Sequence, residues 1–206
     1  MTLSGFFQLV WETILDPATA AHRVLALNIS RENLWLAVLL ATVLSAIAGG
    51  ISQAIVPVEP MVVETVNGPV SMNMSPASPM MQGIFVGASL VLMIFALYFT
   101  GQALGGRGTF PGTLALMAWL QIVMVALQVA TLVLMLAVPL FGTILVFVSF
   151  VVFLRGMAMF VKELHGFDSL GRAIATMILA FLGVAVGLAI ILLFIGVGAG
   201  GADINV

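Results

Sequence analysis

Long apolar runs, separated by short polar segments, fill the sequence after its first thirty residues. A helix needs ~20 predominantly apolar residues to cross the ~30 Å hydrocarbon core of a bilayer. Five stretches reach this length, and we expect a transmembrane helix in each: residues 34–56, 81–104, 113–136, 138–160 and 170–196. The pattern therefore predicts an all-α integral membrane bundle of five transmembrane helices, with residues 34–206 as its transmembrane domain.

The first 33 residues carry a two-sided pattern instead. Apolar side chains recur at helical spacing on one face, at Phe6, Phe7, Val10, Trp11 and Ile14, with polar Ser4, Gln8 and Glu12 opposite. Asp16-Pro17 suits the start of a second helix, ending near Asn28, because Asp is a favoured N-cap and Pro a favoured first residue. We predict that residues 1–33 form N-terminal amphipathic helices in the cytoplasmic membrane interface. They would either rest on the ends of the spans or dock a partner.

The number of spans depends on the boundary between the third and the fourth, where only Pro139 and Gly142 interrupt the apolar run. A single bent helix there would leave four spans. Lys and Arg near span ends concentrate on the cytoplasmic side. Five spans place all six basic residues on one side, whereas four would move three of them outside: Arg155, Lys162 and Arg172. We therefore predict five spans, a cytoplasmic N-terminus and an outer C-terminus, with Arg155 near the inner end of its span and reaching toward the headgroups.

The predicted outer loop, residues 57–80, contains five prolines, which prevent a long helix. Residues 61–66 and 69–74 can pair as a small hairpin around Asn67-Gly68, a preferred two-residue turn. Methionines in the same loop are soft ligands of the kind that suits Cu(I). Methionine is also frequent on ordinary apolar surfaces, so we expect no metal there.

The composition agrees with a membrane location. Of 206 residues, 63% are hydrophobic and 7% charged, whereas a soluble domain carries about 25% charged residues. The net charge of −2 and six dispersed Lys and Arg residues provide no basic patch for nucleic acid. The absence of cysteine excludes disulfides and thiolate chemistry.

The expected spans contain no Asp, Glu or His. Proton-coupled transporters usually carry such residues as relays, and intramembrane metalloproteases need His and Glu on neighbouring turns. The two histidines, His22 and His165, lie far apart in the sequence and outside the spans. We therefore expect no enzymatic activity and no cofactor.

Small residues recur four positions apart along the spans, in the pairs Gly83 and Gly87, Gly101 and Gly105, and Gly183 and Gly187. Such pairs let helix backbones approach closely within a membrane. They predict packing inside the bundle or, as the alternative, a homo-oligomer.

Three amides accompany these small residues: Gln102, Gln121 and Gln128. An amide facing lipid would be costly, so these side chains are expected to face the bundle interior. There they would either form interhelical hydrogen bonds or line a path for a small solute.

Polar and charged residues gather in the inner segments, above all in residues 162–168. Basic residues near an anionic leaflet contribute ~1 kcal/mol each to binding it. The candidate contacts to lipid headgroups or to a protein partner are Arg23, Arg31, Arg107, Arg155, Lys162, His165 and Arg172. His165 would add pH sensitivity to such a surface.

Three segments carry a resemblance to a known family. They are Ile14-Leu15-Asp16-Pro17, residues 105–119 with their Gly-Gly-Arg-Gly-Thr-Phe-Pro-Gly-Thr opening, and Glu163-Leu164-His165-Gly166-Phe167. In these segments and in its five spans the chain resembles the bacterial branch of the YIP family, the Yip-one domain proteins of Ypt/Rab-interacting type. The resemblance implies a multi-pass protein of the bacterial inner membrane and supplies no catalytic residues. Eukaryotic relatives act with Rab-type GTPases, but the short N-terminal segment here lacks their long extension, so that role does not carry over.

The leading hypothesis is a non-enzymatic membrane protein that organises the bilayer or binds a protein partner through its cytoplasmic face. The alternative is a channel or transporter with an amide-lined path for a small solute.

Overall fold

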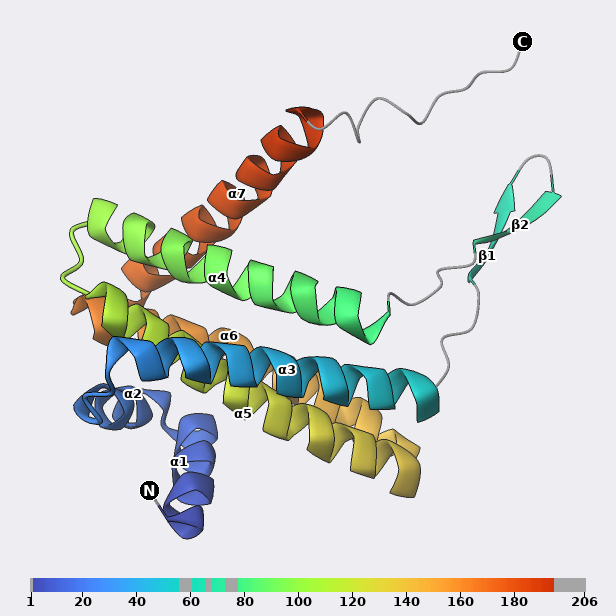
Figure 1. The fold of residues 1–206 in the computed structure, drawn as a ribbon, viewed down its shortest axis with the longest axis horizontal. Helices are drawn as coiled ribbons and strands as arrows, with labels where there is room; N and C mark the ends of the chain where they lie inside the picture. Colours follow the sequence, from blue (N-terminus) through green and yellow to red (C-terminus); the bar gives the residue numbers. More distant parts are fainter. Residues whose placement is uncertain (1, 56–60, 66–67, 73–77, 195–206) are drawn as a thin grey trace. The chain divides into compact units, whose positions relative to one another are not determined.

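The computed structural model describes residues 2–55, 61–65, 68–72 and 78–194, which form seven helices and two strands (Figure 1). Two short helices come first, α1 (Leu3–Leu15) and α2 (Pro17–Ala26). Five long helices follow: α3 (Arg31–Ile55), α4 (Pro79–Ala103), α5 (Phe110–Ala137), α6 (Pro139–His165) and α7 (Leu170–Phe194). All five are long and apolar enough to cross a membrane, so the predicted all-α membrane fold is confirmed.

The ends of the predicted first and fifth spans, at residues 56 and 195–196, lie outside the described residues. Contacts between residues divide the chain into two compact units. The first contains the described parts of Met1–Ile29, Leu90–Met117 and Leu154–Val206, and the second contains Ser30–Ser89 and Ala118–Phe153.

The break between α1 and α2 lies where the sequence predicted it. The Asp16 side chain accepts a hydrogen bond from the Thr19 amide, and Pro17 is the first residue of α2. The helix ends at Ala26, two residues earlier than expected, and Asn28 follows with a positive φ of 45°. The placement of these helices in the membrane interface stays a prediction.

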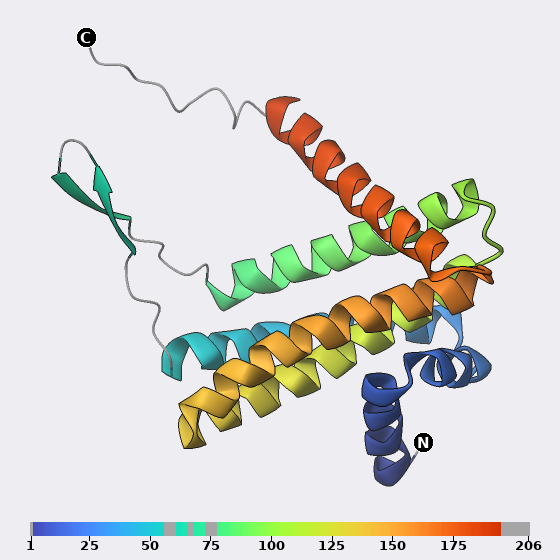
Figure 2. The ribbon, with the colours of Figure 1, turned by 180° about the vertical axis from the view of Figure 1, so that it is seen from behind.

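In the second unit, α5 and α6 are separate helices joined at Val138, so residues 110–165 do not form one bent helix (Figure 2). The Val138 carbonyl accepts from the amides of Phe141 and Gly142. A methyl group at Gly142 would lie 2.7 Å from the backbone of Met135. The hairpin can be this tight because Gly142 lacks a side chain.

Small residues and amides also join α3 to α4 in the second unit. Methyl groups at Gly83 and Gly87 would lie about 3 Å from Ala46 and Thr42, so these glycines face α3. The Gln53 amide donates to the Gln82 side chain at 3.1 Å.

The predicted hairpin is present as strands β1 (Met61–Thr65) and β2 (Gly68–Met72), which pair antiparallel. Its register differs from the prediction. Gly68 pairs with Thr65 as the first residue of β2 and is not a turn residue. Residues 57–60, 66–67 and 73–77 of the predicted turn and loop lie outside the described residues, and Pro79 and Met80, expected at the end of the loop, begin α4.

Candidate functional site

The first unit contains a junction of helix ends that begins with the C-terminus of α4. Gly105 has φ +82°, and its amide donates to the Gln102 carbonyl at 3.0 Å, while the Gly106 amide donates to the Gly101 carbonyl at 2.8 Å. This pair of bonds is a Schellman cap, which satisfies the last carbonyls of a helix. Glycine suits position 105 because a left-handed conformation costs other residues about 1–2 kcal/mol.

The C-terminus of α6 repeats this arrangement. Gly166 has φ +64°, its amide donates to the Glu163 carbonyl, and the Phe167 amide donates to the Lys162 carbonyl at 3.0 Å. Two Schellman caps therefore turn the chain out of α4 and α6.

His165 connects the two caps. Its carbonyl accepts a hydrogen bond from the Arg107 amide at 3.0 Å, and its Nδ1 accepts one from the Gly108 amide at 3.3 Å. A ring nitrogen that accepts carries no proton, so the imidazole is neutral with its hydrogen on Nε2, as assigned from this bonding pattern. The loop after α4 is thus bonded to the last residue of α6 through both backbone and side chain.

Three glycines enclose the His165 ring, which is only 1% exposed. A methyl group at Gly101, Gly106 or Gly108 would lie less than 3.0 Å from ring atoms, a separation that real side chains do not adopt. Nε2 is buried and has no partner of full hydrogen-bond geometry within the described part of the chain, although the Leu97 backbone interacts with the ring. An unpaired buried donor costs about 1–3 kcal/mol, so the packing around the ring must offset that cost.

Phe167 covers one face of the same ring, with centroids 5.3 Å apart and planes inclined by 20°. The Arg172 guanidinium lies 5.7 Å from the centroid of Phe167. The buried imidazole is thereby linked through one aromatic ring to a charge at the surface.

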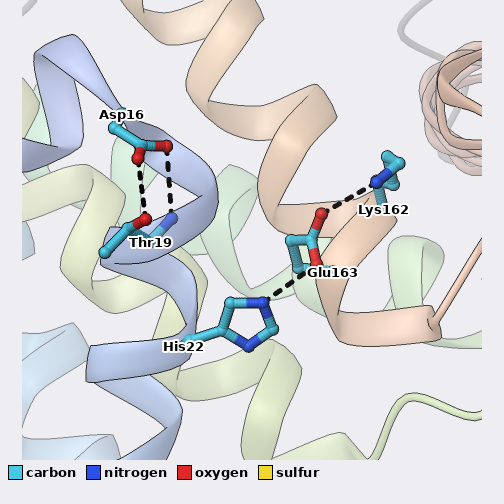
Figure 3. A network of polar contacts seen from close by, with 5 residues as sticks. All are labelled: Asp16, Thr19, His22, Lys162 and Glu163. Carbon is cyan, nitrogen blue, oxygen red and sulfur yellow. Dashed lines mark hydrogen bonds and ion pairs between the residues drawn. The ribbon is translucent and has the colours of Figure 1, made fainter.

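Helix α2 joins the junction through a short polar network (Figure 3). His22 Nε2 lies 3.0 Å from one carboxylate oxygen of Glu163, and Lys162 Nζ lies 2.9 Å from the other. Glu163 is 17% exposed, so its two partners compensate a carboxylate that is largely removed from water. Figure 3 also shows Asp16 held by Thr19, whose hydroxyl and amide bonds lower the pKa of that carboxyl group.

Helix α1 is attached at its other end by Arg155. The Nη1 and Nη2 atoms of this residue donate to the carbonyls of Ile14 and Leu15, each at 2.9 Å. The last carbonyls of a helix lack intrahelical donors and carry a partial negative charge, which a guanidinium matches. An ion pair between Glu12 and Arg23 connects α1 to α2.

The remaining predicted residues divide into several groups. Arg107 and Arg172 are exposed in the first unit, whereas Arg31 is exposed in the second. His165 was expected on an exposed surface and instead lies inside the junction. Gly101 and Gly105 were expected as a packing pair, but Gly101 accommodates the His165 ring and Gly105 forms a cap, with no atom within 4 Å of a methyl group there.

The other small residues and amides differ in their surroundings. No neighbouring atom lies within 4 Å of a methyl group at Gly183 or Gly187. Gln102 is exposed rather than interior and donates to the Gly108 carbonyl at 2.5 Å. Gln121 is half-buried and donates to the Ser45 hydroxyl at 2.9 Å in the second unit, and Gln128 is also half-buried.

Sequence reasoning missed the two caps, the Arg155 contact and the His22–Glu163 pair. The caps had a signal, since Gly105 directly follows a predicted span and Gly166 follows a basic residue, Lys162, and His165, which are typical of the last turn of a helix. Nothing in the sequence alone indicated that Arg155 would meet α1, about 140 residues away.

Five helices of membrane-spanning length and composition define a multi-pass membrane protein. The Yip1 domain matches residues 11–197. The chain therefore belongs to the Yip1 domain family. A search of curated proteins and a search of solved structures each found no match.

Proposed function

We propose that this chain is a non-enzymatic membrane protein that binds a protein partner through one surface of the first unit, the junction face. It comprises the polar side chains that surround the His165 junction: His22, Arg23, Arg107, Lys162, Asp168 and Arg172. One observation carries this proposal. Segments from α2, the α4–α5 loop and the α6–α7 loop are bonded together around one buried imidazole, and their charged side chains are left at the surface.

A preorganised surface favours binding because little conformational entropy is lost when a partner docks. The backbone bonds from Arg107 to His165 and from Phe167 to Lys162 fix both loops. The Arg107 and Arg172 side chains remain exposed, and Asp168 is 95% exposed. Mixed charges on fixed loops provide specificity through electrostatic complementarity.

The same geometry gives little support to catalysis. The His165 ring is 1% exposed and enclosed by glycines, so a substrate cannot approach the nitrogen that a general base would use. His22 is accessible but is paired with Glu163, which Lys162 also contacts.

The side of the membrane follows from the same residues. Arg107, Lys162 and Arg172 all lie at or beside the connections after α4 and α6. Under the positive-inside rule these connections are cytoplasmic. The proposal therefore places the junction face and the N-terminus in the cytoplasm and the C-terminus outside, in the inner membrane of a bacterium.

The amides support packing more than a path for a solute. Gln121 is bonded to Ser45 of a neighbouring helix, and Gln102 is bonded to a backbone carbonyl. Each of these two amide groups makes a hydrogen bond within the chain, so we do not propose transport as a second function.

The test is photocrosslinking in native membranes, with a photoreactive residue at position 107 or 168. Position 182 of α7, an exposed apolar site, is the matched control. The expected result is one recurrent protein captured from positions 107 and 168 and absent from position 182. With the photoreactive residue at position 168, Arg107→Glu should abolish that capture, while Arg107→Lys should preserve it. Identical capture from all three positions, or capture that Arg107→Glu leaves unchanged, would refute the proposal.

A further inference from the structure

An apolar groove of about 580 Å³ lies between α6 and α7 in the first unit. Its size is within the range of ~300–1,000 Å³ typical of small-molecule sites. Ala158 lies on its α6 side, and Ile174, Ile178 and Phe181 lie on its α7 side. These three α7 residues are 42%, 54% and 42% exposed, so the groove opens onto the apolar surface that α7 presents to a bilayer.

Arg155 is the charged residue of the groove lining. Its bonds to the carbonyls of Ile14 and Leu15 use two of the five N–H groups of a guanidinium. None of the Asp and Glu residues in the described ranges forms an ion pair with it at 4.0 Å or less. The nearby Asp16 carboxylate is bound by Thr19, whose hydrogen bonds lower the pKa of Asp16 more than Arg155 does. Arg155 therefore brings a positive charge and spare donors to one part of an otherwise apolar groove.

We propose that this groove binds an anionic phospholipid, with one acyl chain between α6 and α7 and the phosphodiester at Arg155. The groove has the two chemical properties that such a ligand requires, an apolar channel and one cation. A guanidinium binds phosphate through paired, charge-assisted hydrogen bonds. A lipid is the committed occupant because the channel is apolar and the α7 residues beside it are both apolar and exposed, as a surface in contact with hydrocarbon requires.

Helix α1 supplies an independent argument for the depth of Arg155. Leu3, Phe7 and Trp11 lie along one stripe of α1 and are 80%, 66% and 62% exposed. A helix with such a stripe lies at the boundary between headgroups and acyl chains. Since the end of α1 is bonded to Arg155, an interfacial α1 places the guanidinium at the depth of lipid phosphates. This inference is independent of protein binding at the junction face.

The test is native mass spectrometry of the delipidated full chain, titrated with phosphatidylglycerol and with diacylglycerol of the same acyl chains, which lacks the phosphodiester. The wild type should bind one phosphatidylglycerol about tenfold more tightly than diacylglycerol, the difference expected for one charge-assisted contact between the phosphodiester and Arg155. Arg155→Gln should remove that preference, and Arg155→Lys should retain part of it. Arg31→Gln, which changes an exposed arginine outside both the groove and the junction face, is the matched control and should keep the full preference.

A second variant tests the groove without touching Arg155. Ile178→Trp should obstruct the channel and weaken the binding of both lipids. Leu182→Trp, at an exposed site outside the groove lining, should leave the binding of both lipids unchanged. Equal affinity of the wild type for the two lipids would overturn the proposal, as would unchanged lipid binding in Ile178→Trp. The proposal would also be overturned if the lipid-free chain self-associates and Ile178→Trp prevents this self-association, because the groove would then be an interface between copies.

Discussion

Replacing Gly101 with Ala tests the central contact of the junction. A methyl group there would lie less than 3.0 Å from three atoms of the His165 imidazole. The ring cannot easily move aside, because Nδ1 accepts from Gly108 and Phe167 stacks on one face. We therefore expect Gly101→Ala to destabilise the first unit and loosen the loop after α4.

The magnitude follows from two opposing contributions. Overpacking a filled site costs typically about 1–3 kcal/mol, and displacing the ring would also lose the Gly108 hydrogen bond, worth ~1 kcal/mol. Alanine recovers ~1 kcal/mol because glycine is a poor helix former. The expected net loss of unfolding free energy is about 2 kcal/mol.

The assay is unfolding by sodium dodecyl sulfate in mixed micelles, followed by tryptophan fluorescence. Gly183→Ala is the matched control, since Gly183 is also helical but a methyl group there meets no atom within 4 Å. It should be neutral or stabilising by up to ~1 kcal/mol. In a His165→Ala background, Gly101→Ala should no longer be destabilising. The reasoning is refuted if Gly101→Ala is as stable as the wild type, or if its cost persists without the imidazole.

Three further predictions concern the attachments of α1, α2 and the second unit. Hydrogen bonds from Thr19 lower the pKa of the Asp16 carboxyl group. The stabilisation that this cap gives to α2 should therefore be complete above the pKa of ~3.9 that Asp has in the unfolded chain. It should be lost as the pH falls through the lower folded pKa, which amide exchange of α2 would detect and Asp16→Ala would abolish. Arg155→Gln should speed amide exchange in the last turn of α1, because the Ile14 and Leu15 carbonyls lose their donors; unchanged exchange would contradict that attachment. Gln121→Leu should cost about 1 kcal/mol or less in micelle unfolding, as membrane hydrogen bonds do, and less still when Ser45 is already Ala.

The helical fold was predictable from the sequence because the thickness of a bilayer sets the number of consecutive apolar residues that a transmembrane helix needs. Positions of helix breaks needed a second signal. Asp16-Pro17 provided one through known capping chemistry, and α2 begins there. At Val138 only Pro139 and Gly142 interrupted the run, and the structure shows that a single residue suffices to separate α5 from α6.

The candidate site was predictable in outline only. The loops around Arg107 and Lys162 were identified from their polarity, and both belong to the junction. The role of His165 was assigned wrongly as a surface residue, because a polar residue in a polar segment gives no sign of burial. Its burial depends on glycines from α4 and the loop after it, which lie nearly 60 positions earlier in the chain.

Gly101 and Gly105 show why residue spacing alone did not separate a packing contact, which Gly101 makes with His165, from a helix cap, which Gly105 forms. A Schellman cap places its left-handed residue four positions after the residue whose carbonyl closes the cap. Two glycines four apart at a helix end therefore fit a cap as well as they fit a packing pair, and the nearby Arg107 and Pro111 favour the cap because both indicate that the span has ended.

The distinction between a cap and a packing pair bears on function. A junction built from backbone bonds and glycines does not depend on the exposed side chains around it, so Arg107 and Arg172 can be substituted without disturbing the fold, as the proposed partner binding requires. That separation of scaffold from surface favours recognition over catalysis, since an enzyme would direct its fixed polar groups toward a substrate.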